Sequence, residues 1–408
     1  MPKLAINGGE KMCANTWPTW PMWDDRERRA LLDVLESGKW WYGERVKEFE
    51  AAYAAFQDAR YGVTATSGTT ALEAALLAIG VGAGDEVIVP PYTFVATASA
   101  VLRVNAVPIF ADIEPHTLCI DPADVERKIT PRTKAVIPVH LAGFVADMDR
   151  LNALAKVHHL AIVEDACHSW GGKWKGKGTG ALGACGVFSF QASKNITSAE
   201  GGIMLTDDEE VAEQCRSFTN VGRRKGGAWY EHVLLGSNLR LTEFQAALLL
   251  AQLSRLEEHT LKREANAKIL NRGLRDIPGI AVIEDDPRIT RRAYHLYCFR
   301  LDQGKLGVTR ERFLEALSAE GVPSTAGYTT PLYKNPLFQH RHEGAKGCPV
   351  SCPYHGHPVD YTAVSCPVCE QVCRDTCWIF HTALLADEQH MRGIVAAVSK
   401  VVENIAEL

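Results

Sequence analysis

The 408-residue sequence has no apolar run close to the roughly 20 residues that a membrane-spanning helix needs. It also lacks any long basic or acidic block, and its formal net charge is -5, so neither nucleic acid nor a membrane is expected as a partner. Residues 1–21 contain no apolar signal core, which predicts a cytoplasmic protein. What is present is an ordinary globular composition, 46% hydrophobic and 23% charged.

Cysteine is concentrated in one region, because six of the 12 cysteines lie between Cys348 and Cys377. A Cys-x3-Cys pair and a Cys-x2-Cys pair in this cluster are compatible with a tetrahedral zinc site. However, Cys373 and Cys377 share helical spacing, and prolines at 349, 353 and 367 indicate turns. Free cysteine is a common buried residue, and a cytosolic protein keeps its thiols reduced. We therefore predict that this cluster holds no metal.

Strand-like and helical patterns alternate between residues 63 and 164. The expected strands are 63–65, 86–90, 107–112, 134–140 and 160–164, with helices at 70–79, 94–104 and 151–158. Such alternation predicts an α/β fold with a mostly parallel sheet covered on both faces. Functional groups of these sheets lie at the carboxyl ends of the strands. The residues that fall there are Ser67, Thr69, Tyr92, Phe94, His140 and Asp165.

A long helical pattern from Thr242 to Arg272 marks the transition to a second, smaller lobe. Beyond it, strand-like patterns at 294–301 and 322–326 alternate with helical patterns at 309–320 and 387–405. We predict a large domain at residues 1–265 and a smaller α+β domain at 266–408. The aromatic, proline-rich segment 17–23 is expected to pack as a strap on the core or on a partner subunit.

The stretch 161–202 carries the strongest chemical signal. Asp165 ends an apolar, strand-like run, and Lys194 lies in a polar turn after a second such run at 186–190. A lysine in a loop at the end of a buried strand loses solvent, which lowers its pKa and makes the amine nucleophilic. Each residue alone is more often a solvated surface group. Together they supply the imine-forming amine and the acid for a pyridinium nitrogen that pyridoxal 5'-phosphate requires.

A Ser-Gly-Thr turn at Ser67, Gly68 and Thr69 precedes the expected helix 70–79. Such a turn directs free backbone N–H groups and the positive end of the helix dipole at an anion, so it is a candidate phosphate site. A plain capped helix is at least as good an interpretation of this segment alone. Thr70 and Glu73 fit a capping box for that helix.

Six motifs together resemble the sugar aminotransferase family known as DegT/DnrJ/EryC1/StrS, and they occur in the order typical of that family. The resemblance runs from about residue 17 to the C-terminus and implies a homodimeric, pyridoxal-phosphate-dependent enzyme with cofactor sites at the subunit interface. It also implies the aspartate aminotransferase-like fold-type I architecture, with a large mostly parallel-sheet domain and a smaller α+β domain. The motifs are SGTTALEAAL, DEVIVPPYTFVATASAV, PVHLAGFVADMD, VEDACHSWGG, SFQASKNITSAEGG and GSNLRLTEFQAALL.

The resemblance assigns roles to single residues of this chain. Lys194 matches the lysine that binds the cofactor covalently, and Asp165 matches the partner of the pyridine nitrogen. His168 stands where the family has Gln or His beside the cofactor ring and its phenolic oxygen, Phe94 falls where an aromatic residue stacks on the ring, and Asn238 matches an asparagine that reaches the phosphate of the neighbouring subunit. The matched phosphate contacts are Ser67, Gly68, Thr69 and Ser189.

The expected activity is transfer of an amino group from L-glutamine or L-glutamate to a keto-cyclitol or keto-sugar. Relatives that are dehydratases carry histidine at the lysine position, whereas this chain has Lys194. The W-P-x-W-P start and the GSNLRLTEF motif resemble cyclitol aminotransferases and 3-amino-5-hydroxybenzoate synthases more than nucleotide-sugar enzymes. The alternatives are a nucleotide-linked keto-sugar aminotransferase, a dehydratase or aromatising synthase on the same fold, and a non-catalytic binding or metal module.

The acceptor is expected to be free of a nucleotide. A diphosphate needs several basic groups on rigid backbone. The obvious basic cluster, Arg223, Arg224 and Lys225, is flanked by glycines and is predicted to form a mobile loop. We therefore expect an acceptor of one ring and glutamine as the preferred donor.

Overall fold

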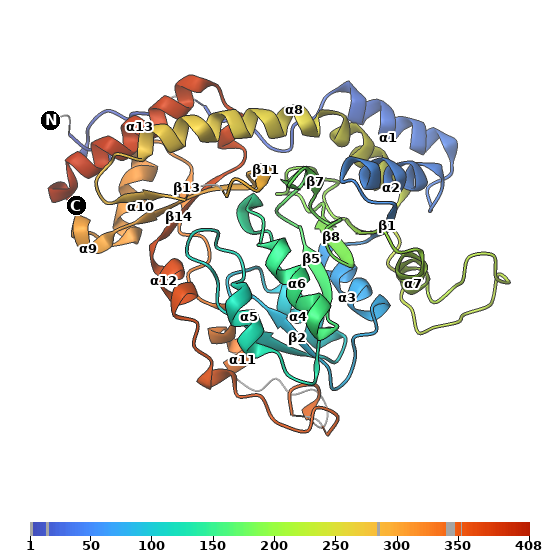
Figure 1. Ribbon diagram of the computed structural model, residues 1–408. Coiled ribbons are helices and arrows are strands. Elements are labelled where there is room, and N and C mark those ends of the chain that lie inside the picture. Colours follow the sequence, from blue (N-terminus) through green and yellow to red (C-terminus); the bar gives the residue numbers. More distant parts are fainter. Residues whose placement is uncertain (1–2, 14–15, 284–285, 340–346, 352) are drawn as a thin grey trace.

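The computed structural model describes residues 3–13, 16–283, 286–339, 347–351 and 353–408 (Figure 1). Its centre is a seven-stranded sheet in the order β1-β9-β8-β5-β4-β2-β3. Every strand of this sheet except β9 runs in the same direction, so the expected mostly parallel sheet is confirmed. Its strands are β1 Tyr61–Ala65, β2 Glu86–Val89, β3 Val107–Phe110, β4 Thr133–Val136, β5 Ala161–Asp165, β8 Cys185–Ser189 and β9 Gly202–Thr206.

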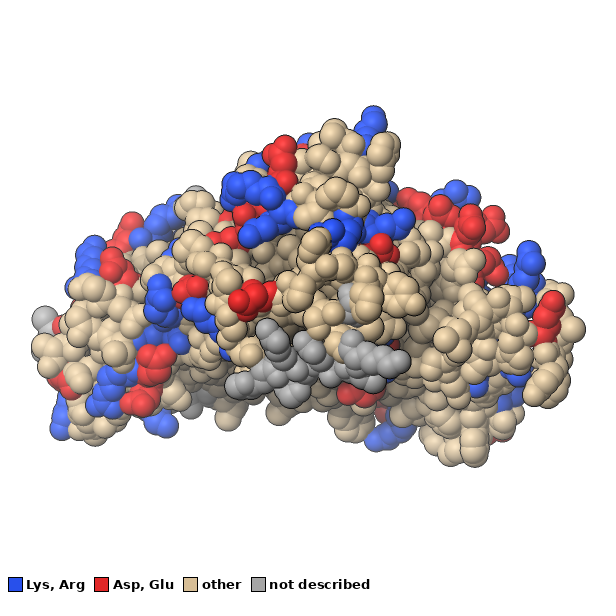
Figure 2. Space-filling view, turned by 90° about the horizontal axis from the view of Figure 1, so that it is seen from below, with Lys and Arg blue, Asp and Glu red and all other residues tan. Residues whose placement is uncertain are grey.

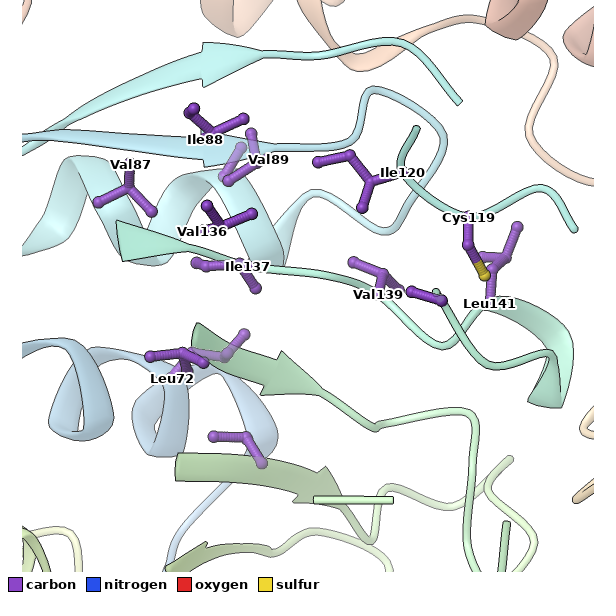
Figure 3. Packing of buried hydrophobic residues seen from close by; sticks show 14 of the residues in the cluster. Leu72, Val87, Ile88, Val89, Cys119, Ile120, Val136, Ile137, Val139 and Leu141 are labelled. Carbon is purple, nitrogen blue, oxygen red and sulfur yellow. The ribbon is translucent and has the colours of Figure 1, made fainter. Parts of the chain in front are cut away.

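Helices alternate with these strands and cover the sheet (Figure 1). Figure 3 shows Val87, Ile88 and Val89 of β2 next to Val136 of the neighbouring β4, with Leu72 of α3 farther along the same buried cluster. The burial of these β-branched side chains on both faces explains the near-continuous apolar runs of the strands. The helices are α1 Asp25–Ser37, α2 Glu44–Phe56, α3 Gly68–Ala78, α4 Ala96–Arg103, α5 Pro122–Lys128, α6 Met148–His158 and α7 Glu209–Thr219.

A second, antiparallel sheet in the order β10-β12-β14-β13 lies beside the first. The 32-residue helix α8 (Glu243–Leu274) runs along both parts of the molecule, from α1 and α2 to α13 (Figure 1). The remaining elements are β10 Ile280–Val282, β11 Ile289–Arg291, β12 Leu296–Leu301, α9 Gln303–Leu306, α10 Arg310–Ala319, β13 Ser324–Thr325, α11 Pro336–Gln339, α12 Pro367–Asp375, β14 Thr376–Phe380 and α13 Glu388–Glu403. A three-stranded sheet joins β11 to the hairpin β6 (Lys173–Trp174) and β7 (Lys177–Gly178).

Each of the two large buried clusters includes residues from the opposite end of the chain. The cluster around β12, β14 and α13 includes Leu4 and Cys13 from the N-terminal segment. The cluster around the large sheet includes Tyr333, Phe338 and Tyr361 from the C-terminal part. The predicted boundary at 265/266 falls inside α8 and stays a prediction, because the single helix contributes to both parts.

Two local expectations were wrong. The capping box of α3 is formed by Ser67 and Thr70, not by Thr70 and Glu73, because the helix begins at Gly68 and makes Ser67 the N-cap. The strand expected at 134–140 ends at Val136. Beyond it, Pro138 has no N–H to continue the ladder, and the chain makes only a bridge between Val139 and Asp165.

Four of the five cysteines of this cluster that the structure describes are buried, and two of them lie in a helix. Cys369 and Cys373 lie one turn apart on α12, with their sulfur atoms 4.0 Å apart, and Cys377 follows on β14. Cys352 lies outside the described residues. Within the described part of the chain, no group of three or more His, Cys, Asp or Glu is placed to hold a metal ion. The predicted absence of a bound metal is not tested by this geometry and stays a prediction.

Acidic and basic side chains are interspersed on the face of the molecule seen in Figure 2. This distribution agrees with the lack of single-sign blocks in the sequence. Among the helices that the structure describes, none has the length and apolar character needed to cross a bilayer.

Candidate active site

A cavity of about 530 Å³ lies at the carboxyl ends of the parallel strands, where β12 and β14 of the second sheet face it. The loops that follow β1, β2, β5 and β8 all reach it, as the sheet topology predicts for a ligand site. Its lining residues are Ser67, Gly68, Thr69, Leu72, Thr93, Phe94, Ala96, Val139, Asp165, Cys167, His168, Ser189, Gln191, Ser193, Lys194, Glu200, His295, Leu296, Tyr328, Trp378 and Phe380.

Lys194 lies in the loop between β8 and β9, and its side chain lines the cavity. Its backbone N–H donates to the carbonyl of Gln191 at 2.9 Å, which closes a tight turn. The amine lies 5.7 Å from the ring centre of Trp170. Burial lowers the pKa of Lys194 from its ordinary value, while the nearby Asp165 opposes that shift. A lowered pKa increases the fraction of free amine at neutral pH, as nucleophilic attack requires.

Asp165 is the last residue of β5 and is almost fully buried. The hydroxyl of Thr97 donates to one carboxylate oxygen at 2.7 Å, and the backbone N–H of Cys167 donates to the other at 3.2 Å. These two bonds hold the carboxylate in a fixed orientation beside the cavity. An oriented, buried carboxylate can accept a further charge-assisted bond from a protonated ring nitrogen.

Glu164 precedes Asp165 but points to the opposite face of the sheet, because side chains alternate along a strand. Its oxygens accept backbone N–H bonds from Gly180, Leu182 and Gly183, each at 2.7 Å. The ring of His140 lies 2.8 Å from the same carboxylate. The sequence placed His140 among the functional groups at the strand ends. The structure instead uses it to pair with Glu164, and it does not line the cavity.

His168 follows β5 and its buried ring lines the cavity. Its Nδ1 accepts the backbone N–H of Ala142 at 3.4 Å, so the neutral ring carries its hydrogen on Nε2. Burial, together with the charge of Lys194, holds the pKa of His168 well below its ordinary value. The ring is therefore a neutral donor at physiological pH.

The N-terminus of α3 lines one side of the cavity and presents free backbone N–H groups that can bind an anion. Ser67 is its N-cap, and the first N–H groups after it have no partner within the helix. A Cβ at Gly68 would lie 2.8 Å from Cβ of Ser189 and 3.1 Å from Sγ of Cys167. Only glycine therefore lets the helix start approach Ser189 this closely. Hydroxyls of Ser67, Thr69 and Ser189 line the same space.

Of two further predicted site residues, Phe94 lines the cavity and Asn238 does not. Phe94 lines the cavity with 58% of its surface exposed, so its ring is free to cover a ligand. Asn238 is exposed, bridges to Asn220, and does not line the cavity of its own chain. It belongs to the long loop between α7 and α8 that extends away from the body of the molecule (Figure 1). Its expected role toward a neighbouring subunit stays a prediction.

An aromatic wall, defined here as Tyr328, Trp378 and Phe380, closes the cavity from the smaller lobe and was missed by sequence reasoning. The Tyr328 and Trp378 rings meet edge to face with centres 4.8 Å apart. The indole N–H of Trp378 is buried without a hydrogen-bond partner among the described residues. The available signal was the two-residue spacing of Trp378 and Phe380, which places both side chains on one face of β14.

The fold and the cavity define the class of protein. An α/β enzyme of the fold-type I transferase architecture carries a half-buried lysine, an oriented carboxylate and a helix N-terminus suited to an anion in one cavity. The family model of the DegT/DnrJ/EryC1/StrS aminotransferases matches residues 21–359. The chain belongs to this family and is an aminotransferase, as the six sequence motifs predicted.

Individual relatives agree with this assignment. An L-glutamine:2-deoxy-scyllo-inosose aminotransferase from Micromonospora echinospora is 40% identical over 435 residues, covering 100% of this chain and 100% of the relative. The crystal structure of 3-amino-5-hydroxybenzoic acid synthase matches with a TM-score of 0.86 and 34% identity, covering 95% of this chain and 99% of that chain. NtdA from Bacillus subtilis, solved with the bound cofactor PMP, matches with a TM-score of 0.80 and 27% identity over 93% of this chain and 82% of that chain.

Proposed function

We propose that this aminotransferase uses pyridoxal 5'-phosphate to transfer the amino group of L-glutamine to a keto-cyclitol. The observation that carries the cofactor assignment is the meeting of Lys194, Asp165 and the start of α3 in one cavity. These groups match an aldehyde, a pyridine nitrogen and a phosphate, the three parts of the cofactor that a protein must hold. The similarity to NtdA, which binds PMP, supports the same assignment.

Each residue has a defined part in holding the cofactor. Lys194 would bind it covalently through Nζ, and the carboxylate of Asp165 would keep the ring nitrogen protonated. The N–H groups of Gly68 and Thr69 would bind the phosphate, with hydroxyls from Ser67 and Ser189. The tight approach of α3 to Ser189, which Gly68 permits, places these donors on the same side of the cavity.

When bound, the cofactor supplies an electron sink for the bond changes at the substrate carbon. The free amine of Lys194, with its pKa lowered by burial, is the base that takes the proton from Cα of glutamine. In the second half of the reaction the same amine delivers a proton to the former carbonyl carbon of the acceptor. With Nδ1 accepting from Ala142, Nε2–H of His168 would donate to an oxygen of the cofactor beside its ring.

The choice of acceptor rests on the charge and shape of the cavity. Among the described residues that line it, Lys194 is the only lysine or arginine, so this chain offers no basic pair for a diphosphate. The aromatic wall instead provides flat apolar surfaces, which suit the carbon face of an acceptor of one ring. Relatives that share the whole chain length are named for glutamine and deoxy-scyllo-inosose, which supports the same choice.

The test is a side-by-side assay of the purified enzyme with glutamine. Ketones of the scyllo-inosose type would be compared with nucleotide-linked 3- and 4-keto sugars, with amine formation measured by mass spectrometry. We expect amination of the cyclitol ketones and little turnover of the nucleotide-linked ones. Amination of the nucleotide-linked ketones alone would refute the acceptor assignment and leave the aminotransferase assignment intact.

A second candidate is an aromatising synthase reaction, which the structural match to 3-amino-5-hydroxybenzoic acid synthase favours. That reaction would give a product with an aromatic absorption spectrum, which amino-cyclitols lack. Product analysis in the same assay therefore separates the two candidates.

The proposal includes a homodimer with shared active sites in the cytoplasm. The exposed position of Asn238 on its extended loop is compatible with a contact to a neighbouring subunit. Full activity of a monomer at low concentration, measured by light scattering and turnover in parallel, would contradict the dimer.

A further inference from the structure

Three residues from distant parts of the chain hydrogen-bond to the loop that carries Lys194. The indole N–H of Trp20 donates to the carbonyl of Ala192 at 3.0 Å. Nε2 of His381 lies 3.0 Å from the carbonyl of Ser193. Bonds to positions 192 and 193, together with one to position 195, therefore flank the lysine on both sides.

The third bond joins His295 to Asn195. Nδ1 of His295 lies 2.9 Å from Oδ1 of Asn195, while Nδ2 of Asn195 donates to the carbonyl of Ala293 at 3.0 Å. Because the Asn195 oxygen must accept, Nδ1 of His295 carries the hydrogen. The same reasoning fixes His381. Its Nδ1 accepts from Nη2 of Arg263 at 3.1 Å, so its hydrogen is on Nε2, where it donates to Ser193.

Arg263 has an unusual environment for a cation. Its side chain is fully buried, and its Nε and Nη1 have no hydrogen-bond partner among the described residues. No carboxylate of the described residues lies within salt-bridge distance of it. Its guanidinium instead faces the ring of Trp20 at 5.8 Å. Burial lowers the pKa of Arg263 to about 9. A buried cation of this kind is costly unless it is hydrogen-bonded, and the bond from Nη2 to His381 supplies one such partner.

The imidazoles are arranged as a stack that leads to the cavity. The ring of His381 lies 5.5 Å from that of His295, which lies 4.3 Å from that of His168. Burial holds the pKa values of His295 and His381 well below the ordinary value, and the charges of Arg263 and Lys194 act in the same direction. Both rings are therefore neutral near pH 7 and keep the single tautomers deduced above.

We propose that Trp20, His295 and His381, with Arg263 behind them, form a clamp that positions Lys194 for proton transfer. The clamp residues act through the backbone and side chain of the loop, so they are positioning residues and not catalytic ones. This inference rests on the proposed function of Lys194 for its consequence in catalysis, but the clamp itself is a property of the chain without cofactor. It also gives the aromatic N-terminal segment a specific role, because Trp20 reaches the turn that carries the lysine.

The variants are chosen to separate hydrogen bonding from packing. His381→Phe keeps a ring beside Trp20 and His295 but removes both hydrogen bonds. His381→Gln keeps a donor for Ser193 and an acceptor for Arg263. His355→Phe is the matched control, because His355 is equally buried and bonds to Glu86 at 2.9 Å, at the opposite end of the large sheet.

The first measurement is amide hydrogen exchange of residues 190–198 in the full-length protein without cofactor. We expect exchange in His381→Phe to rise roughly tenfold, the effect of losing about 1.4 kcal/mol of local stability. The exchange rate in His381→Gln should stay within about threefold of the wild-type rate, and the rate in His355→Phe should match wild type in this segment. Wild-type exchange in His381→Phe would overturn the clamp whether or not the enzyme uses pyridoxal phosphate.

The second measurement is the glutamine half-reaction with pyridoxal phosphate bound. We expect kcat of His381→Phe to fall by roughly 10- to 100-fold with KM unchanged, as for a misplaced reacting group. The pH titration of the cofactor absorbance should shift in His381→Phe and not in His355→Phe. If kcat falls equally in His381→Phe and His381→Gln, the packing of the ring and not its hydrogen bonds matters, and the proposal is overturned. If wild-type protein shows no absorbance linked to Lys194, the proposed function fails, while the exchange result still decides the clamp.

Discussion

The two walls of the cavity differ in chemistry and in origin. The wall from the large sheet is polar, with Lys194, Asp165 and Ser67 presented at or just after the ends of strands. The wall from the smaller lobe is mainly aromatic and comes from Tyr328, β14 and the start of β12. In the function proposed above, the first wall holds the cofactor and moves protons, while the second selects the shape of what enters. That proposal assigns chemistry and acceptor choice to separate parts of the chain.

The largest effect should come from the polar wall. Lys194→Ala should abolish turnover, because no other amine among the described residues lines the cavity, and should leave only non-covalent cofactor. Turnover and borohydride labelling followed by peptide mapping would measure this. Lys177→Ala, which changes an exposed lysine paired with Asp207, is the control and should behave as wild type. Labelling of a different lysine would refute the assignment.

The next effect compares two neighbouring carboxylates on opposite faces of one strand. Asp165→Asn should lower turnover more than tenfold, because it removes a charge-assisted bond worth roughly 1.5–3 kcal/mol and weakens the electron sink. Glu164→Gln should mainly lower the melting temperature, because that carboxylate accepts three backbone N–H groups away from the cavity.

Turnover and thermal unfolding measured on both variants separate the two roles. The comparison fails if Asp165→Asn turns over at wild-type speed. It also fails if Glu164→Gln loses activity without losing stability.

Sequence reasoning found the polar wall because its residues directly follow strand ends and sit in recognisable motifs. Lys194 and Asp165 lie within one 42-residue stretch, and their meeting follows from the adjacency of parallel strands. Sequence reasoning also grouped His140 with these residues, because its position near a strand end does not tell which face of the sheet its side chain takes. His140 does lie at the same edge of the sheet as Asp165. Its ring, however, pairs with Glu164 on the face away from the cavity.

The aromatic wall and the clamp could not be assembled from local patterns alone. Tyr328, Trp378 and His381 reach the cavity region only when the smaller lobe packs beside the large sheet. The bond from Trp20 to Ala192 spans 172 residues of sequence, and that from His381 to Ser193 spans 188. Contacts of such separation depend on tertiary packing, which periodicity and capping signals do not encode.

A moderate effect should come from the aromatic wall. Trp378→Phe keeps an aromatic ring but removes part of the indole surface, on which we propose that the acceptor ring packs. The KM for the cyclitol ketone should rise about fivefold, the effect of losing about 1 kcal/mol of apolar contact. The rate of the glutamine half-reaction should change less than about twofold, since the lost contact is one made with the acceptor. An equal effect on both half-reactions would show that the two walls do not divide the work in this way.

The smallest effect on KM is expected from the basic residues of the loop between α7 and α8, which a nucleotide-linked acceptor would need most. Arg224 and Lys225 are exposed on the loop between α7 and α8, and neither lines the cavity of its own chain. Replacing both with Ala should change the KM for a cyclitol ketone by less than about twofold, because surface charges far from a neutral ligand contribute little. If this loop instead holds a diphosphate from a neighbouring subunit, the double variant should lose activity toward nucleotide-linked ketones at least tenfold, since charge-assisted bonds contribute about 1.5–3 kcal/mol each. Measuring both acceptor classes at two ionic strengths distinguishes the cases, because only the charged acceptor should respond to added salt.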